Sequence, residues 1–195
     1  MHVAELSHAE RRPWKNGAGE TRELLVWPEA DVWGLRISVA DIVVAAPFSE
    51  FPGIDRWIAV LTGDGLRLAI RSSAAVTLHS EDDKLHAFSG DDPVSCALLG
   101  SSTTDVNIMV RRACWRATIT PTRRRTRIDT TARLVACFVS SSAVLRAEGV
   151  ATRAASGSAV LWLDNANRNP MTLAIDEPGP RGWWIELVGR SEPDG

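Results

Sequence analysis

Leu35-Arg36-Ile37-Ser38-Val39-Ala40 gives the clearest indication of how this chain folds, because its apolar and polar side chains alternate. Successive side chains of an extended strand point to opposite faces. Leu35, Ile37 and Val39 therefore share one face, whereas Arg36 and Ser38 share the other. The polar face has two interpretations: it lines a site at the mouth of a barrel, or it faces bulk solvent.

Similar short apolar or alternating runs recur about every ten residues on both sides of this stretch, with turn residues between them. They cover residues 24–27, 33–40, 57–61, 66–70, 76–79, 94–99, 106–110, 115–119, 134–139, 159–163, 171–175 and 183–188. This spacing predicts an all-β sandwich or barrel with little helix. The tetrad Thr62-Gly63-Asp64-Gly65 is typical of a hairpin turn whose glycines supply positive φ angles.

The size of the chain limits its domain organisation. Its 195 residues suffice for one large domain or for two halves that share a core. A weak repeat of strand, tight turn, strand, Gly-containing bend and strand favours the second arrangement. We expect a single domain over residues 1–195, with halves at about residues 1–112 and 113–195.

The composition excludes several classes of partner. A net charge of −2 argues against nucleic acid, and the arginine-rich run at residues 121–127 contains no aromatic residue, so we interpret it as a solvated loop. The chain has no run of ~18 apolar residues that could span a membrane, and its start lacks the apolar region of a signal peptide. Cys96, Cys114 and Cys137 lie in apolar stretches without CxxC spacing, which predicts reduced core cysteines and a cytoplasmic protein.

Three polar clusters interrupt the strands. The first is the glycine-punctuated loop at residues 12–22. The second, at residues 47–56, holds Asp55 and Arg56, which could instead form an ion pair inside a well-packed loop. The third, at residues 105–112, alternates, so that one strand face carries Asp105, Asn107, Met109 and Arg111. Such a polar row is costly to bury unless it is hydrogen-bonded or binds something.

Together these clusters resemble the HutD/Ves family. The motifs that carry the resemblance are Pro13-Trp14-Lys15-Asn16-Gly17-x-Gly19-x-Thr21, Trp33-x-x-Arg36-Ile37-Ser38-x-Ala40, Pro47-Phe48-Ser49-x-Phe51-Pro52-Gly53-Ile54-Asp55-Arg56, Phe88-x-Gly90-Asp91 and Asp105-x-Asn107-x-Met109-x-Arg111-Arg112. The resemblance implies an all-β bicupin, a cupin-like double-stranded β-helix with two sandwich or barrel halves in one chain. It also implies an association with histidine utilisation and, in the Ves branch, with cold or stress response. Binding of a histidine-degradation intermediate such as N-formylglutamate has been proposed for the family.

One position departs from the family pattern. Three consecutive glycines are common in the family, whereas this chain has Gly17-Ala18-Gly19. If the middle position requires a positive φ, Ala18 is strained by roughly 1 kcal/mol or more.

Metal and enzyme signatures are absent from the sequence. Cupin enzymes usually hold a divalent metal through a His-x-His pair, and none of the four histidines forms one. We expect a metal-free protein without a cofactor. The alternative is a metal site that His79 and His86 share across an acidic loop. The chain also lacks a Gly-x-Ser-x-Gly elbow, a P-loop and a dinucleotide fingerprint, so no catalytic residue is assigned.

The polar residues of the clusters favour a small acidic metabolite as partner. Lys15, Arg36 and Arg56 could neutralise carboxylates, polar side chains could recognise amide or formyl groups, and aromatic rings could form the walls. The candidate ligand-binding residues are Trp14, Lys15, Asn16, Thr21, Arg36, Ser38, Phe48, Ser49, Phe51, Asp55, Arg56 and Asn107.

Three functional hypotheses follow. The first is a non-catalytic protein that senses or sequesters a small acidic metabolite of histidine catabolism, such as N-formylglutamate. The second is a metal-independent isomerase, lyase or amide hydrolase with Lys15 or Asp55 as general base. In the third, the polar clusters are purely structural. The adjacent rings of Trp183 and Trp184 point to opposite strand faces, which suggests a surface for a homodimer.

Overall fold

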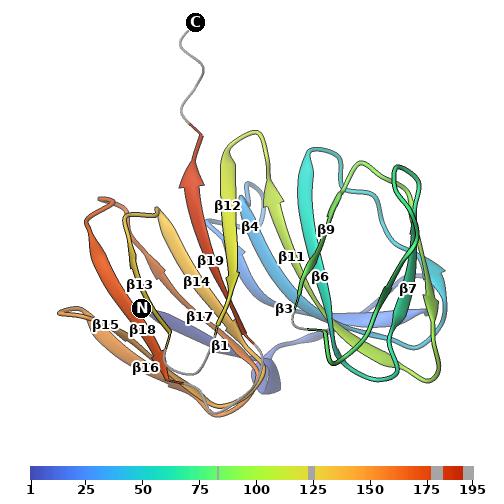
Figure 1. Ribbon diagram of the computed structural model, residues 1–195, viewed down its shortest axis with the longest axis horizontal. Helices are drawn as coiled ribbons and strands as arrows, with labels where there is room; N and C mark the ends of the chain where they lie inside the picture. The colour runs from blue at the N-terminus through green and yellow to red at the C-terminus, as the bar shows by residue number, and fades with distance from the viewer. Residues whose placement is uncertain (83, 123–125, 177–181, 191–195) are drawn as a thin grey trace, which may run out of the picture. The chain divides into compact units, whose positions relative to one another are not determined.

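The structure, a computed structural model, describes residues 1–82, 84–122, 126–176 and 182–190. The described residues form β-strands joined by loops, with one short 3-10 helix, η1 (Leu6–His8), which confirms the all-β prediction (Figure 1). The chain divides into two compact units. We call Glu10–Ala113 the N-terminal unit, and Met1–Ala9 together with Cys114–Gly195 the C-terminal unit.

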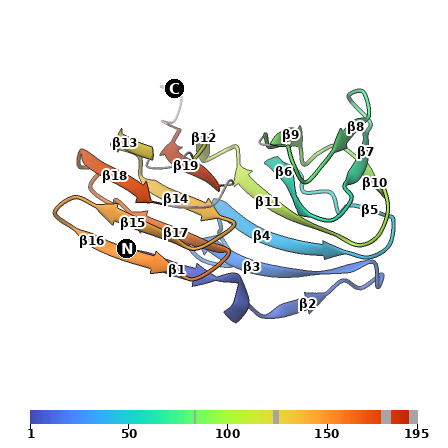
Figure 2. The same ribbon diagram turned by 60° about the horizontal axis from the view of Figure 1, so that its bottom comes forward.

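The N-terminal unit consists of two antiparallel sheets that face each other (Figure 2). Its strands are β2 (Arg11–Pro13), β3 (Gly19–Trp27), β4 (Leu35–Ile42), β5 (Ala46–Pro47), β6 (Ile54–Thr62), β7 (Leu66–Ile70), β8 (Val76–Leu78), β9 (His86–Ser89), β10 (Val94–Leu98) and β11 (Thr103–Arg111). The larger sheet has the order β2-β3-β4-β11-β6-β9, and the smaller has the order β5-β10-β7-β8. Apolar side chains of both sheets pack between them at one end, among them Ile58, Val60, Leu66 and Leu68.

The alternation of residues 35–40 is present in β4 as predicted. Leu35, Ile37 and Val39 are fully buried on one face of the strand. Arg36 and Ser38 point to the other face, toward the interior between the two sheets. The polar face of this strand therefore lines a cavity rather than bulk solvent.

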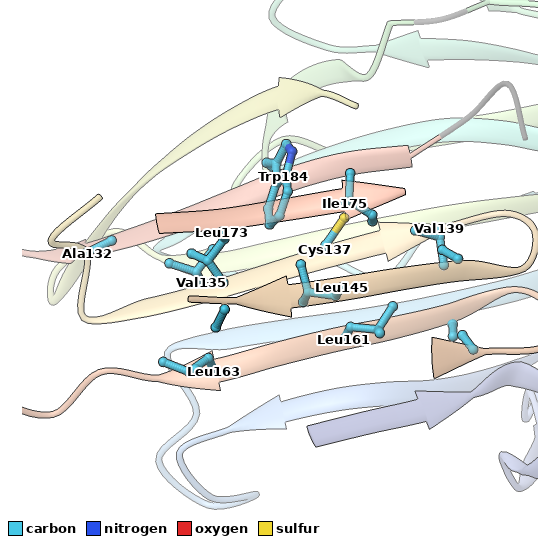
Figure 3. Close-up of a cluster of buried hydrophobic side chains, with 14 residues drawn as sticks. Ala132, Val135, Cys137, Val139, Leu145, Leu161, Leu163, Leu173, Ile175 and Trp184 are labelled. Carbon is cyan, nitrogen blue, oxygen red and sulfur yellow. The ribbon is translucent and has the colours of Figure 1, made fainter. Parts of the chain in front are cut away.

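The C-terminal unit also consists of two antiparallel sheets, with the orders β1-β17-β14-β19-β12 and β13-β18-β15-β16. Its strands are β1 (His2–Glu5), β12 (Trp115–Pro121), β13 (Thr126–Thr130), β14 (Leu134–Val139), β15 (Ala143–Ala147), β16 (Ala151–Ala155), β17 (Ala159–Asp164), β18 (Met171–Asp176) and β19 (Gly182–Gly189). Strand β1 belongs here because it pairs with β17 at the sheet edge. Figure 3 shows the interior of this unit filled by apolar side chains, including Cys137, Leu145, Leu161 and Trp184.

The expectation that Trp183 and Trp184 supply an exposed surface is wrong, and the expectation of buried cysteines is confirmed for two of the three. Trp183 and Trp184 are only 2% and 0% exposed, because β19 lies inside its sheet and both of its faces are buried. The two rings supply no exposed surface, and a homodimer stays a prediction. Cys96 and Cys137 are buried, but Cys114 is exposed, because it lies in the turn that precedes β12.

The turn at Thr62-Gly63-Asp64-Gly65 is not a hairpin. Gly63 and Gly65 have the expected positive φ angles of 96° and 114°. However, β6 pairs with β11 and β9, whereas β7 pairs with β10 and β8, so the turn carries the chain from one sheet to the other.

Two further expectations concern charge and the membrane. Residues 123–125 of the arginine-rich run lie outside the described residues. Among those that are described, no helix has the length and apolar character needed to cross a membrane.

Candidate functional site

A cavity of about 580 Å³ lies in the N-terminal unit. Every candidate ligand-binding residue lines it except Asp55. The cavity thus brings together side chains from all three polar clusters, which lie far apart in the sequence.

Strand register explains how one wall of the cavity is built. Met109 on β11 lies between Arg36 on β4 and Arg56 on β6, which places two guanidinium groups at one level of the sheet. Two residues along β11, Asn107 pairs with Ser38, and a further two residues along, Asp105 pairs with Ala40. Because side chains two residues apart share a face, these groups all point into the cavity.

Two β-bulges lie beside this wall. One interrupts the pairing of β3 with β4 between Glu23 and Leu25, and the other interrupts the pairing of β11 with β6 between Thr104 and Asp105. A bulge adds a residue to one strand and redirects the side chains that follow it. Glu23 and Asp105, which border the two bulges, both line the cavity.

Arg56 is the most unusual group of the site, because it is a cation that is only 5% exposed. Its guanidinium carbon lies 4.8 Å from the ring centre of Phe88, 5.4 Å from that of Phe51 and 5.6 Å from that of Phe48, within the range of cation–π contacts. Its Nη1 donates to the carbonyl oxygen of Ser49 at 3.1 Å, whereas its Nε has no partner. Burial lowers the pKa of Arg56 to about 10, so the side chain stays charged at neutral pH.

Asp105 is the buried carboxyl group of the cavity wall, and it is 1% exposed. Burial raises its pKa to about 7; the nearby Arg56 opposes this rise, and Asp41 adds to it. Its Oδ1 has no hydrogen-bond partner, and neither has the Oδ1 of Asn107. Asp41 is on the reverse face of β4, where it accepts hydrogen bonds from Arg22 and Thr104, both at 2.6 Å.

The carboxylate of Glu23 is occupied by arginines. It accepts a hydrogen bond from Arg12 and forms an ion pair with Arg36, whose Nε lies 3.1 Å from its Oε1 without hydrogen-bond geometry. Glu23 was not among the predicted site residues. In the sequence it resembles any glutamate on a solvated strand face, and only its pairing with Ser38 reveals that it points inward.

The loop between β2 and β3 forms another part of the cavity lining, and its own hydrogen bonds shape it. Trp14 Nε1 donates to Thr21 Oγ1 at 2.7 Å, and the amide of Ala18 donates to Asn16 Oδ1 at 3.1 Å. Thr21 and Asn16 were predicted to recognise the ligand, and the structure uses these oxygens of both to hold the loop. Lys15 is exposed.

Ala18 is not strained. Gly17 adopts a φ of 70°, whereas the φ of Ala18 is negative. The methyl group of Ala18 is buried, and its carbonyl oxygen accepts from the amide of Val43 at 2.9 Å. The position therefore tolerates a Cβ, and the concern raised by the family's three glycines does not apply.

Asp55 belongs to a separate network. It follows Ile54 on β6 and points to the face opposite that of Arg56, so the two form no ion pair. It accepts instead from Arg112 Nε at 2.9 Å. Arg112 also binds Asp91, whose pKa is lowered to about 2 by hydrogen bonds from the Gly53 amide, Ser89 and Arg112.

The cavity does not fit the divalent metal of cupin enzymes. The described side chains that line it include no histidine or cysteine. Its carboxylates are Glu23, which is bound by arginines, and Asp105, which lies near Arg56. Within the described ranges, no group of three or more His, Cys, Asp or Glu residues could hold a metal ion, and His79 and His86 belong to no such group.

Comparisons with known proteins identify relatives over most of the chain. The HutD family model matches residues 6–179. An uncharacterised 21.2 kDa protein of the hutC 3' region of Pseudomonas putida is 38% identical over 136 residues, which is 69% of this chain and 70% of that protein. Protein Ves of Citrobacter koseri is 39% identical over 101 residues, 51% of this chain and 52% of that protein.

Solved structures show the same relationship. HutD from Pseudomonas fluorescens SBW25, in a formate condition, matches with a TM-score of 0.85 and 27% identity, covering 97% of this chain and 99% of that one. Oxalate decarboxylase from Bacillus subtilis matches with a TM-score of 0.64 at 9% identity over 96% of this chain and 76% of that one, which shows a shared fold alone. The predicted cupin-like fold and the resemblance to HutD/Ves proteins are thereby confirmed, and the chain belongs to the HutD family.

Proposed function

We propose that this HutD-family protein is a cytoplasmic, non-catalytic binding protein for a small acidic metabolite of histidine breakdown, such as N-formylglutamate. The observation that carries the proposal is Arg56, a buried cation beside the cavity whose Nε has no partner. An unpaired buried charge is costly, and a carboxylate is the group that a guanidinium binds best. A ligand carboxylate would supply the missing acceptor.

The other properties of the cavity support a ligand of this kind. Arg36 lies at the same level of the sheet as Arg56, and its Nε has no hydrogen-bond partner although it forms an ion pair with Glu23, so a dicarboxylate would meet two guanidinium groups. The volume of about 580 Å³ is in the usual range for small-molecule sites. The relationship to histidine utilisation rests on the family and on the relative of the hutC region.

The enzyme hypothesis assigned Lys15 or Asp55 as general base, and only Lys15 lies where it could act on a ligand in the cavity. Asp55 is outside the cavity and bound by Arg112, whereas Lys15 lines the cavity as an exposed residue. The buried titratable carboxyl group of the cavity is Asp105, whose pKa of about 7 is suited to proton transfer. Turnover of a bound ligand that requires Asp105 would favour an enzyme over a binding protein.

Thermal unfolding in the presence of histidine, urocanate, formiminoglutamate, N-formylglutamate and glutamate tests the proposal. A ligand at ~100 times its dissociation constant should stabilise the protein by about 2.7 kcal/mol, which is roughly 5–10 °C for a chain of this size. We expect that shift for an acidic compound, its loss in Arg56→Met, and its retention in Arg112→Met, which removes an arginine outside the cavity. No shift with any of the five compounds would overturn the proposal.

A further inference from the structure

The cavity has two ends of opposite chemical character. At the level of Met109, Arg36 and Arg56 present N–H donors. At the levels of Asn107 and Asp105, about 7 and 14 Å further along the same strand, the buried side-chain atoms without a partner are instead the Oδ1 oxygens of these two residues. A ligand that lies along the strand therefore meets donors at one end and acceptors at the other.

The acceptor end is unsatisfied. The Oδ1 atoms of Asp105 and Asn107 are both buried and without a partner, although both side chains line the cavity. These residues are 1% and 9% exposed. A buried acceptor without a donor destabilises the protein, so two such groups on one cavity wall indicate that a donor is supplied by something bound there.

A plain dicarboxylate cannot supply that donor, because its oxygens only accept hydrogen bonds when ionised. It would satisfy the two arginines and place a second set of acceptors against Asp105 and Asn107. A nitrogen group with one N–H would satisfy one of these oxygens, and a group with two N–H bonds could satisfy both. The contrast between the two ends thus constrains the ligand beyond its negative charge.

We propose that Asp105 and Asn107 form a subsite for an N–H group, so that the ligand class is a carboxylate that also bears an amide, amidine or imidazole nitrogen. This inference rests on the proposed function, because the arginine end must hold the carboxylate. It assigns specificity to residues that do not bind the charge. Asp105 and Asn107 select the nitrogen, whereas Arg36 and Arg56 hold the acid.

The test compares three ligands that differ at one group. N-formylglutamate carries an N–H, and 2-(formyloxy)glutarate has an ester oxygen in its place; glutarate lacks the group altogether. Isothermal titration of the wild type at pH 8, above the pKa of about 7 of Asp105, should show N-formylglutamate binding at least 10-fold more tightly than the ester. A site that hydrogen-bonds an N–H discriminates strongly against an analogue without it, because its own polar groups are then left unpaired.

Variants of the cavity wall test which residues discriminate between the amide and the ester. Asp105→Asn introduces an N–H donor into the wall and Asn107→Leu removes an acceptor, so each should lower the amide-to-ester ratio by at least about 5-fold. Ile108→Val, on the opposite face of β11 and outside the cavity lining, is the matched control and should leave the ratio unchanged. Circular dichroism would establish that each variant is folded.

Two results would contradict this account in different ways. Equal binding of amide and ester by the wild type, or an unchanged ratio in both subsite variants, would overturn the subsite while leaving a carboxylate-binding protein. Absence of binding by all three compounds would overturn the proposed function, and the subsite with it.

Discussion

Asp105 should make the stability of the protein depend on pH. Its pKa rises from 3.8 to about 7 in the folded state, so between these values the folded protein holds a proton that the unfolded chain has lost. The free energy of unfolding should therefore fall as pH rises from about 4 to 7, by at most about 1.4 kcal/mol per pH unit, and level off above pH 7. The charged groups that interact with Asp105 are Arg56 and Asp41, and Cys96 senses its charge from β10.

Urea unfolding at pH 5, 6, 7 and 8 checks this expectation. Asp105→Asn should gain stability relative to the wild type as pH rises to 7. Asp91→Asn is the control, because the pKa of Asp91 is about 2 and its contribution is lost only in strong acid. A constant difference between wild type and Asp105→Asn across this range would contradict the raised pKa.

Substitutions of Arg112 and Arg56 should affect different properties: the first should lower stability, and the second should weaken ligand binding. Arg112 donates to the Ile54 carbonyl oxygen and to Ser89 Oγ, both at 2.8 Å, and pairs with Asp55 and Asp91. Because this network is partly exposed, Arg112→Met should lower the free energy of unfolding by about 1–2 kcal/mol, measured by urea unfolding, with little effect on ligand affinity. Weakened binding without loss of stability would instead place Arg112 in the ligand site.

Single residues also show how much of the candidate site could be predicted from the sequence. Alternation placed Arg36 and Ser38 on one strand face and Asn107 on the polar face of another strand, because period two is a local property of the chain. It did not decide that these faces point inward, which the structure shows. The same rule, applied to consecutive residues, separates Asp55 from Arg56, although a shared motif suggested that both bind the ligand. The partner of Asp55 could not be foreseen, because Arg112 is distant in the sequence and meets it only through strand pairing.

At the scale of elements, the loop between β2 and β3 explains the departure from the glycine pattern. Ala18 has ordinary backbone geometry and a buried methyl group, whereas Gly17 has a φ of 70°. Ala18→Gly should lower the free energy of unfolding by about 0.5–1 kcal/mol, through the greater flexibility of the unfolded chain, and should not strengthen binding. Urea unfolding and isothermal titration measure the two effects, and a more stable Ala18→Gly variant would contradict this view of the loop.

Elements also show where sequence patterns stop being informative. Periodicity predicted most strands but not the sheet to which each belongs, which is why the turn at residues 62–65 was mistaken for a hairpin. The bulge after Glu23 likewise has no local signature, and this bulge accompanies the inward position of that glutamate. Sheet membership and register depend on contacts between distant segments, so they come from the structure.

At the scale of the whole molecule, the two units differ in how their interiors are filled. Leu145 is 1% exposed within the apolar cluster of the C-terminal unit, whereas the interior of the N-terminal unit includes the polar cavity. Leu145→Ala should destabilise the protein by about 2–5 kcal/mol because it leaves a cavity in this core. Chemical unfolding measures the loss, and isothermal titration under native conditions should show unchanged affinity; a parallel loss of affinity would mean that binding depends on this core.

The most direct measurement is isothermal titration of N-formylglutamate into the wild type and into Arg56→Met. We expect binding at one site per chain in the wild type and a loss of affinity of at least about 10-fold in Arg56→Met, because a charged hydrogen-bond donor has been removed from a buried site. Equal affinity in the two proteins, or no binding to the wild type, would contradict the claim that this cavity is an acid-binding site.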